Sequence, residues 1–246
     1  MSLYTGFPAT EAGIPITAND ENPSQALGQM IYGNDGRKFV YAKAGASALV
    51  RGQVVQSAAE DTGDQNIAAA TAVSGASGYN SAGQFTLVTA AMTVTKNQYA
   101  GGYVAVSVTP GLATYYRIAS HQAFSAAAAT FLLEDEIQVT LTTSSRLDFI
   151  PNPYNGVVVN PTTATSSIAG VAVSALTAGY YGWLQVAGPC PVTNDAAGAL
   201  TVGVAVMASS SVAGSVRLQT AGNKILGQAM TGIAASEVGM VNLSIA

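Results

Sequence analysis

The stretch that decides the fold class is IYGNDGRKFVY, residues 31–41. Its centre, Asn34-Asp35-Gly36, is a short polar turn between two runs rich in β-branched and aromatic residues, Ile31-Tyr32 and Phe39-Val40-Tyr41. An Asp-Gly pair flanked in this way predicts a β-hairpin, because glycine adopts the positive φ that tight hairpin turns require. We therefore expect the chain to enter a β-sheet here.

Other strand patterns continue along the chain. Short β-rich runs occur at residues 53–56, 85–87, 92–95, 103–108 and 157–159. The clearest alternation of apolar and polar residues covers residues 137–141 and predicts a half-buried strand. Two alanine-rich stretches, 67–73 and 124–133, are the only candidates for helix, and we expect one or two short helical turns at most.

The last third of the chain carries a degenerate repeat. A Gly-x-Ala opening recurs at Gly170, Gly203 and Gly227, where glycine allows a close approach of two backbones. Each opening is followed by a further glycine and then by a second β-rich run, at 183–186, 216–219 and 241–243. The pattern predicts strand pairs with compact connections, whereas three degenerate copies are too few to indicate a solenoid.

The composition favours a protein that packs against other protein. Charged residues make up only 9% of the 246 residues, against about 25% in a typical soluble domain. The surface must therefore consist largely of small and uncharged side chains, which lose their hydration water easily when another protein contacts them. The nine Lys and Arg residues form no basic run, which argues against nucleic acid and anionic membrane as partners. No secretion signal and no membrane-spanning apolar run is visible, so we expect a protein made in the cytoplasm.

The first 30 residues have the features of an extended arm. Proline, glycine and asparagine interrupt any regular period there, so we expect residues 1–30 either to be loose or to lie across a neighbouring surface. Removal of this arm is expected to leave the β body folded. Beyond it, residues 31–160 are expected to form the main β domain. Residues 161–246 are expected to form a second β lobe, either separate from the first or continuous with it.

The residues that usually carry chemistry are scarce. His121 is the only histidine, and no Gly-x-Ser-x-Gly motif accompanies it, so we interpret it as a surface or interface residue. Cys190 is the only cysteine and is interpreted as a small core or loop residue. One His and one Cys cannot form a zinc cluster within one chain. We therefore expect no enzyme activity and no cofactor.

Two acidic groups and several aromatic residues are candidate binding sites. Residues 134–136, Glu-Asp-Glu, and the group of Glu60, Asp61 and Asp64 could attract calcium, but both lack the spacing of a calcium loop. We interpret both as solvated loops. The aromatic residues Tyr115, Tyr116, Tyr180, Tyr181 and Trp183 could form a stacking platform for a sugar or a base. Anchoring at a protein interface is the more typical use of such residues.

Several segments resemble the head decoration, or cement, proteins of tailed bacteriophages. The likeness extends over residues 30–246 and consists of Gly, Ala and aromatic patterns without a catalytic signature. The segments that carry it are residues 36–45, 49–55, 99–103, 115–118, 180–188 and 227–246.

The resemblance implies an all-β body, a barrel or sandwich of jelly-roll or β-tulip-like form, with an extended N-terminal arm. It implies a homotrimer that binds the major capsid protein on the outer surface of an icosahedral virion assembled in the host cytoplasm. The expected arm and interface anchors are Leu3, Tyr4, Phe7, Ile14, Ile16, Tyr180, Tyr181 and Trp183. The alternative is a virion fibre or surface module that binds carbohydrate through exposed Tyr and Trp side chains, which requires an open aromatic cleft.

Overall fold

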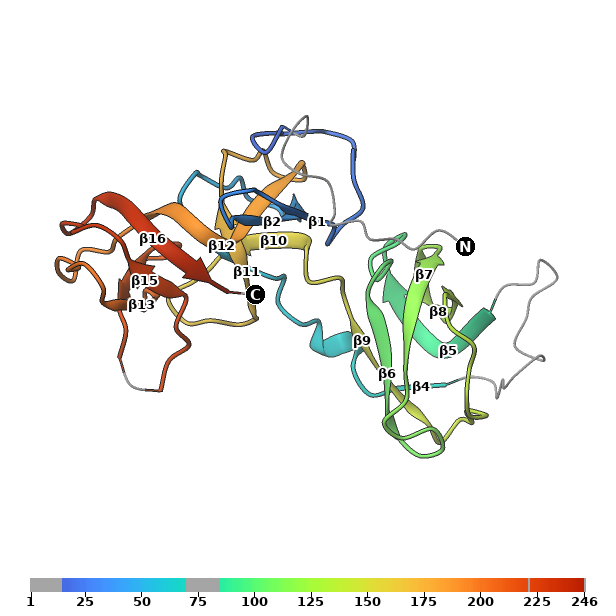
Figure 1. Cartoon of the computed structure of the whole chain (residues 1–246). Coiled ribbons are helices and arrows are strands. Elements are labelled where there is room, and N and C mark those ends of the chain that lie inside the picture. Colours follow the sequence, from blue (N-terminus) through green and yellow to red (C-terminus); the bar gives the residue numbers. More distant parts are fainter. Residues whose placement is uncertain (1–14, 70–84, 221, 246) are drawn as a thin grey trace. The chain divides into compact units, whose positions relative to one another are not determined.

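A computed structural model describes residues 15–69, 85–220 and 222–245, and these residues form β-strands without any α-helix (Figure 1). One turn of 3-10 helix, η1 (Thr62–Asp64), is capped by the Asp61 carboxylate, which accepts a hydrogen bond from the Gly63 N–H. The all-β class is thus confirmed. The strands are β1 (Met30–Tyr32), β2 (Lys38–Ala44), β3 (Val54–Gln56), β4 (Ile67–Ala68), β5 (Phe85–Val94), β6 (Tyr103–Val108), β7 (Tyr115–His121), β8 (Phe124–Leu133), β9 (Arg146–Ile150), β10 (Asn155–Val159), β11 (Ile168–Ala172), β12 (Tyr181–Thr193), β13 (Ala205–Ala208), β14 (Val216–Leu218), β15 (Gly227–Ala229) and β16 (Val238–Ser244).

The chain divides into two compact units, one inserted into the other. Residues Glu60–Asn152 form the inserted unit, and the described residues before and after them form the outer unit. This division differs from the expected boundary between residues 160 and 161. Strand β10, which follows the insertion, pairs with β2 and β3 on the other side of it, so the outer unit is discontinuous in sequence.

The outer unit contains a closed ring of strands. Strand β2 pairs with β10 and β12, β3 pairs with β10 and β11, and β11 pairs with β12. The long strand β12 then continues past the ring and pairs with β16, beyond which the sheet runs through β15 and β13 to β14. A bridge between Asn194, next to the end of β12, and Val216 of β14 brings the two borders of this second part together. The structure is therefore barrel-like at both ends of β12.

The hairpin predicted from residues 31–41 is confirmed. Strands β1 and β2 are antiparallel, Gly33 donates its N–H to the Arg37 carbonyl, and Gly36 adopts a φ of 84°. Along β2 the side chains alternate between two cores. Val40, Ala42 and Ala44 point into the ring, while Phe39 and Tyr41 pack with Ile31 and Trp183 on its outer face.

Residues 15–30 cover this outer face, so they are part of the folded body. Ile16, Ala18 and Leu27 pack against the cluster of Phe39, Tyr41 and Trp183. The segment is also hydrogen-bonded to β2 and β12, because the Ser24 N–H donates to the Tyr41 hydroxyl at 3.1 Å and Asp20 bridges to Tyr181. The expectation of a free arm over all of residues 1–30 is wrong for residues 15–30, and residues 1–14 lie outside the described part.

Glycine makes this covering possible at one position of β12. A Cβ at Gly182 would lie 2.6 Å from the Ala18 carbonyl oxygen and would also collide with the Leu176 side chain. The covering segment can therefore approach β12 only where β12 has no side chain.

The repeat in the last third corresponds to three antiparallel strand pairs, as predicted. They are β11 with β12, β13 with β14, and β15 with β16. At the third opening a Cβ on Gly227 would collide with the Asn242 carbonyl, which confirms the close backbone approach expected there.

The inserted unit is a six-stranded sheet in the order β4-β9-β6-β7-β8-β5. A bridge between Ala69, after β4, and Thr89 of β5 links its two borders. Large side chains fill the interior, among them Tyr99, Tyr116 and Phe131. Residues 124–133, a helix candidate in the sequence, form strand β8. Pairing with the ten-residue strand β5 overrides the helix propensity of their four consecutive alanines.

The strand expected at residues 137–141 is absent. Ile137 and Leu141 are buried as the alternation requires, but Val139 is 41% exposed and the backbone is irregular. The Gln138 N–H donates to the Tyr116 hydroxyl at 3.3 Å, so a side chain takes the place of a neighbouring strand.

Candidate interaction surface

The predicted anchors Ile16, Tyr181 and Trp183 lie together in one cluster of the outer unit, where Trp183 is buried and the other two are partly buried. The Tyr41 ring meets Trp183 edge-on at 5.0 Å between centroids and stacks on Tyr181 at 6.2 Å. Trp183 is only 1% exposed, so it stabilises the fold and is not available as an interface anchor or as a platform for carbohydrate. Its burial follows from the covering segment, which no local sequence signal identifies.

The remaining predicted anchors divide into two groups. Tyr180 is half-buried and its carbonyl accepts a hydrogen bond from the Ala44 N–H, which ties the start of β12 to β2. Leu3, Tyr4, Phe7 and Ile14 lie outside the described residues.

His121 is buried, which corrects its interpretation as a surface or interface residue. Its Nε2 accepts the Tyr99 N–H at 3.0 Å, so the proton is on Nδ1, which donates to the Gln122 carbonyl at 2.8 Å. Burial lowers the pKa of the imidazole. The ring packs against Phe131 at 4.7 Å between centroids, and the neutral side chain serves as a structural element of the core.

Asp64 is also committed to the core of the inserted unit. Its carboxylate accepts the hydroxyl proton of Tyr99 at an O···O distance of 2.5 Å, and the side chain is 4% exposed. Burial is the main cause that raises the pKa of Asp64, with the Tyr99 hydrogen bond acting in the opposite direction. Burial also raises the pKa of the Tyr99 hydroxyl. The pair fixes η1 to the loop that carries Tyr99.

Two of the acidic residues 134–136 are held by Arg117 of β7. The Arg117 guanidinium forms an ion pair with Glu134 at 3.0 Å, and the Arg117 N–H donates to the Asp135 carboxylate at 3.1 Å. Within residues 15–69, 85–220 and 222–245, no three His, Cys, Asp or Glu side chains gather where they could hold a metal ion. The acidic segment therefore closes the end of the β7–β8 pair.

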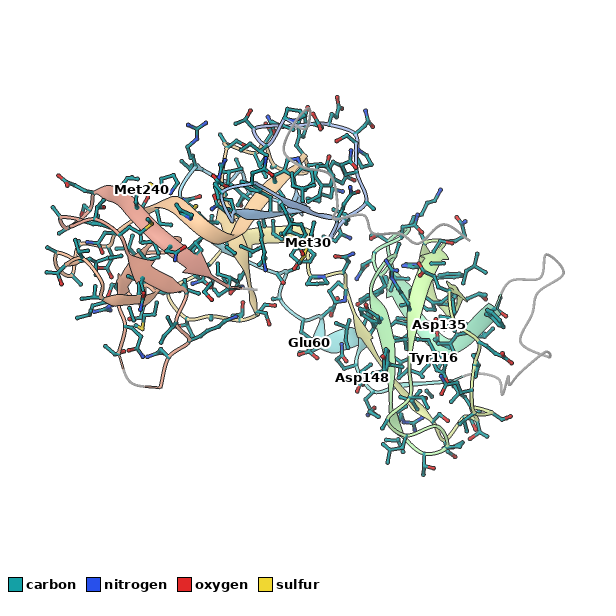
Figure 2. All side chains as sticks on the ribbon, viewed as in Figure 1. Met30, Glu60, Tyr116, Asp135, Asp148 and Met240 are labelled. Carbon is teal, nitrogen blue, oxygen red and sulfur yellow. The ribbon has the colours of Figure 1, made fainter. Side chains whose placement is uncertain are left out.

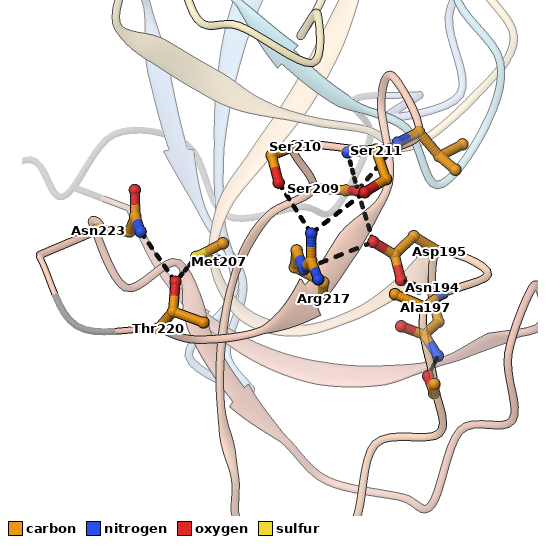
Figure 3. A network of polar contacts seen from close by, with 12 residues as sticks. Asn194, Asp195, Ala197, Met207, Ser209, Ser210, Ser211, Arg217, Thr220 and Asn223 are labelled. Carbon is orange, nitrogen blue, oxygen red and sulfur yellow. Dashed lines mark hydrogen bonds and ion pairs between the residues drawn. The ribbon is translucent and has the colours of Figure 1, made fainter.

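A buried polar network holds the second part of the outer unit together (Figure 3). The Asp195 carboxylate, 1% exposed, accepts the Ser209 hydroxyl at 2.6 Å and the Ala197 N–H at 2.8 Å. The Arg217 guanidinium lies 3.7 Å from the same carboxylate and donates to the Ser210 hydroxyl. The network links the end of β12 to the β13–β14 pair. Sequence reasoning missed it, because its members are far apart in the chain.

Cys190 is confirmed as a core residue. It is fully buried on β12, and burial raises the pKa of its thiol to about 12. A thiol of this kind is chemically inert at neutral pH, since only the thiolate reacts.

Exposed apolar side chains are present on both units. In the inserted unit, Tyr103 lies opposite Ile150 in the sheet and meets Tyr115 edge-on at 6.1 Å between ring centroids. Tyr115 is 66% exposed and Leu112, in the preceding loop, is 62% exposed. On the outer unit the most exposed large apolar residues are Val50, Val202, Leu218 and Val238. Sequence reasoning identified only Tyr115 among these.

Comparison of the chain with protein-family models, curated proteins and solved structures found no match. No helix in the described part of the chain is long and apolar enough to cross a membrane.

Proposed function

We propose that the chain is a non-enzymatic structural protein of a phage virion, a decoration protein that binds as a homotrimer to the outer surface of the capsid. Its partners in this role are further copies of itself and the major capsid protein. The proposal rests on the resemblance described above and on the surface and core of both units.

The observation that carries the proposal is the combination of low charge with exposed apolar side chains on both units. Val202 is 68% exposed, Leu112 62% and Val238 60%, in a chain with only 9% charged residues. Single exposed apolar residues are common on any protein, but a surface that is also poor in charge is weakly hydrated. Packing against other subunits dries such a surface at little electrostatic cost.

The buried ionisable groups support a structural role. Three buried side chains form hydrogen bonds with neighbouring groups of the fold, namely those of His121, Asp64 and Asp195. A general acid or base has to reach a substrate, and these three side chains are enclosed. They position strands and loops.

The cement function requires several weak contacts that act together. In a trimer, the first bound subunit raises the effective concentration of the other two at their sites. Side chains such as Ala, Val and Tyr lose little conformational entropy on docking, so the entropic cost of each contact is small. Residues 1–14 supply Leu3, Tyr4 and Phe7 as further anchors to the capsid in this proposal.

A pelleting experiment tests the proposal. Capsids of the encoding phage that lack this chain are mixed with the purified protein and sedimented. We expect the full chain to pellet with the capsids, and a variant without residues 1–14 to do so more weakly. A full chain that stays in the supernatant at saturating capsid concentration would rule out decoration.

A further inference from the structure

An open groove lies on the inserted unit where β8 separates from β7. Strand β8 pairs with β7 from Ile118 onward, and the Glu134 N–H then donates to the Arg117 carbonyl. Beyond that point residues 134–140 form no strand with β7, and Figure 2 labels Asp135 and Tyr116 in this region. The space left between them is about 480 Å³, within the usual range for ligand pockets of ~300–1,000 Å³. Its lining consists of Ala113, Thr114, Tyr115, Asp135, Glu136 and Gln138.

One wall of this groove is an open strand edge. The Thr114 carbonyl accepts from Val106, and the Ile118 N–H donates to Gly102, so the backbone groups of these residues face β6. Backbone groups alternate in direction along an antiparallel strand. The N–H and C=O of Tyr115 therefore face the groove, on the side where Arg117 bonds to residues 134 and 135.

The side chains around the groove supply complementary chemistry. The Tyr115 ring is 66% exposed, and its edge-on contact with Tyr103 restrains its orientation. Across the groove lie the carboxylate of Glu136 and the amide of Gln138. Within the described residues neither of these two side chains forms a hydrogen bond, so both are available to a ligand.

We propose that this groove binds a neutral saccharide. An exposed tyrosine ring offers an apolar face on which the C–H face of a pyranose can stack. The Glu136 carboxylate accepts hydrogen bonds from hydroxyl groups, while the Gln138 amide both accepts and donates. The open backbone of Tyr115 adds one donor and one acceptor. The hydroxyl groups of a saccharide both donate and accept hydrogen bonds, so they match this combination of donors and acceptors.

The charge of the groove selects against acidic ligands. Asp135 and Glu136 line it, whereas no Lys or Arg is among the described lining residues and Arg117 is already paired with Glu134. A sialylated or phosphorylated sugar would place like charges together and lose binding energy. An extended peptide fits less well, because the open edge of β7 is limited to the residues around Tyr115 and offers few ladder bonds.

The test is a binding screen of the purified full chain against an array of neutral, amino and sialylated oligosaccharides, followed by titration of the best neutral one. Tyr115→Ala removes the stacking face and is expected to weaken binding by about tenfold or more. Gln138→Ala is expected to weaken it less. Tyr115→Phe keeps the ring and should retain most of the affinity. Val139→Ala, an exposed neighbour that does not line the groove, is the matched control and should leave binding unchanged.

Three results would overturn the proposal. They are the absence of any neutral oligosaccharide bound at millimolar concentration, a preference for sialylated sugars, and unchanged affinity in Tyr115→Ala. Because Tyr115 is exposed, an unaltered circular dichroism spectrum of each variant excludes misfolding as the cause of a loss. The inference goes beyond capsid decoration and is independent of it, since pelleting with capsids and binding of a free oligosaccharide are measured separately.

Discussion

The outer and the inserted unit fill their cores in different ways. The ring of the outer unit is filled by buried Ala, Val and Leu side chains, such as Ala42, Val157 and Leu184, and residues 15–30 cover its outer face. The inserted unit instead encloses large rings, such as Tyr99 and Phe149, together with buried polar groups. Aliphatic side chains of this size each bury less apolar area than an aromatic ring does. The remaining buried area of the outer unit therefore comes from closure of the ring and from its cover by residues 15–30. The comparison predicts that the two units respond to different perturbations.

The largest expected effect is a cavity in the inserted unit. Phe149 is fully buried, 4.6 Å from Phe131 and 5.4 Å from Tyr99 between ring centroids. Phe149→Ala should lower the free energy of unfolding of this unit by about 3–5 kcal/mol. Urea unfolding followed by circular dichroism should show the loss. The fluorescence of Trp183, the only tryptophan and a member of the outer unit, should keep its midpoint.

The neighbouring residue provides the control for this cavity. Ile150 is 47% exposed, so Ile150→Ala should change the free energy of unfolding by less than about 0.5 kcal/mol. A shift of the Trp183 midpoint in Phe149→Ala as large as the shift seen by circular dichroism would show that the units unfold together.

The second effect concerns the cover of the outer unit. Removal of residues 1–30 takes away Ile16 and Leu27 and exposes Trp183, so we expect a loss of roughly 3 kcal/mol and a red shift of its fluorescence. Removal of residues 1–14 alone keeps this cover and should leave the fluorescence unchanged. Equal spectra for the two truncated proteins would contradict a structural role for residues 15–30.

The third effect is the loss of the polar network in the outer unit. Asp195→Ala leaves the Ser209 hydroxyl and the Ala197 N–H without their acceptor, which should cost about 2 kcal/mol. Ser210→Ala removes only an exposed contact to Arg217 and serves as the control. The urea midpoint followed by Trp183 fluorescence should fall in Asp195→Ala and stay unchanged in Ser210→Ala.

The smallest effect is a pH dependence confined to the inserted unit. The pKa of His121 is lowered from its ordinary value of 6.5 in the folded state, so the unfolded chain takes up the proton first as the pH falls. The contribution of neutral His121 to the free energy of unfolding is fully present above pH 6.5. Below pH 6.5 this contribution should decline by at most about 1.4 kcal/mol per pH unit. The raised pKa of Asp64 acts in the opposite direction, because its contribution declines as the pH rises above 3.8.

A variant separates the two groups. His121→Gln cannot titrate, so its inserted unit should lose less stability between pH 7 and pH 5 than that of the unmodified chain. The measurement is the urea midpoint by circular dichroism at each pH. Identical pH dependence in both proteins would exclude His121 as the cause.

The sequence predicted those elements that local patterns determine. The turn at residues 34–36 and the three Gly-x-Ala strand pairs could be predicted because turn chemistry and alternation act between residues close in the chain. The same reasoning misassigned residues 124–133, where alanine favours a helix locally and the long partner strand β5 decides the outcome. It also predicted a strand at residues 137–141, where the backbone bonds to the Tyr116 hydroxyl.

Contacts between distant segments could not be predicted. The discontinuity of the outer unit depends on β10 pairing with β2 across the whole insertion. The burial of Trp183 depends on residues 15–30, and that of His121 on Tyr99 and Phe131. The groove beside Tyr115 arises where two strands separate, which is a property of the sheet and leaves no local pattern.

The central claim is that the chain functions by packing against copies of itself, and its mass in solution tests this most directly. Light scattering on a sizing column, over a wide range of concentrations, gives the mass without reference to shape. We predict a mass of about three times the 24.7 kDa of one chain. A mass of one chain at every concentration would contradict the homotrimer.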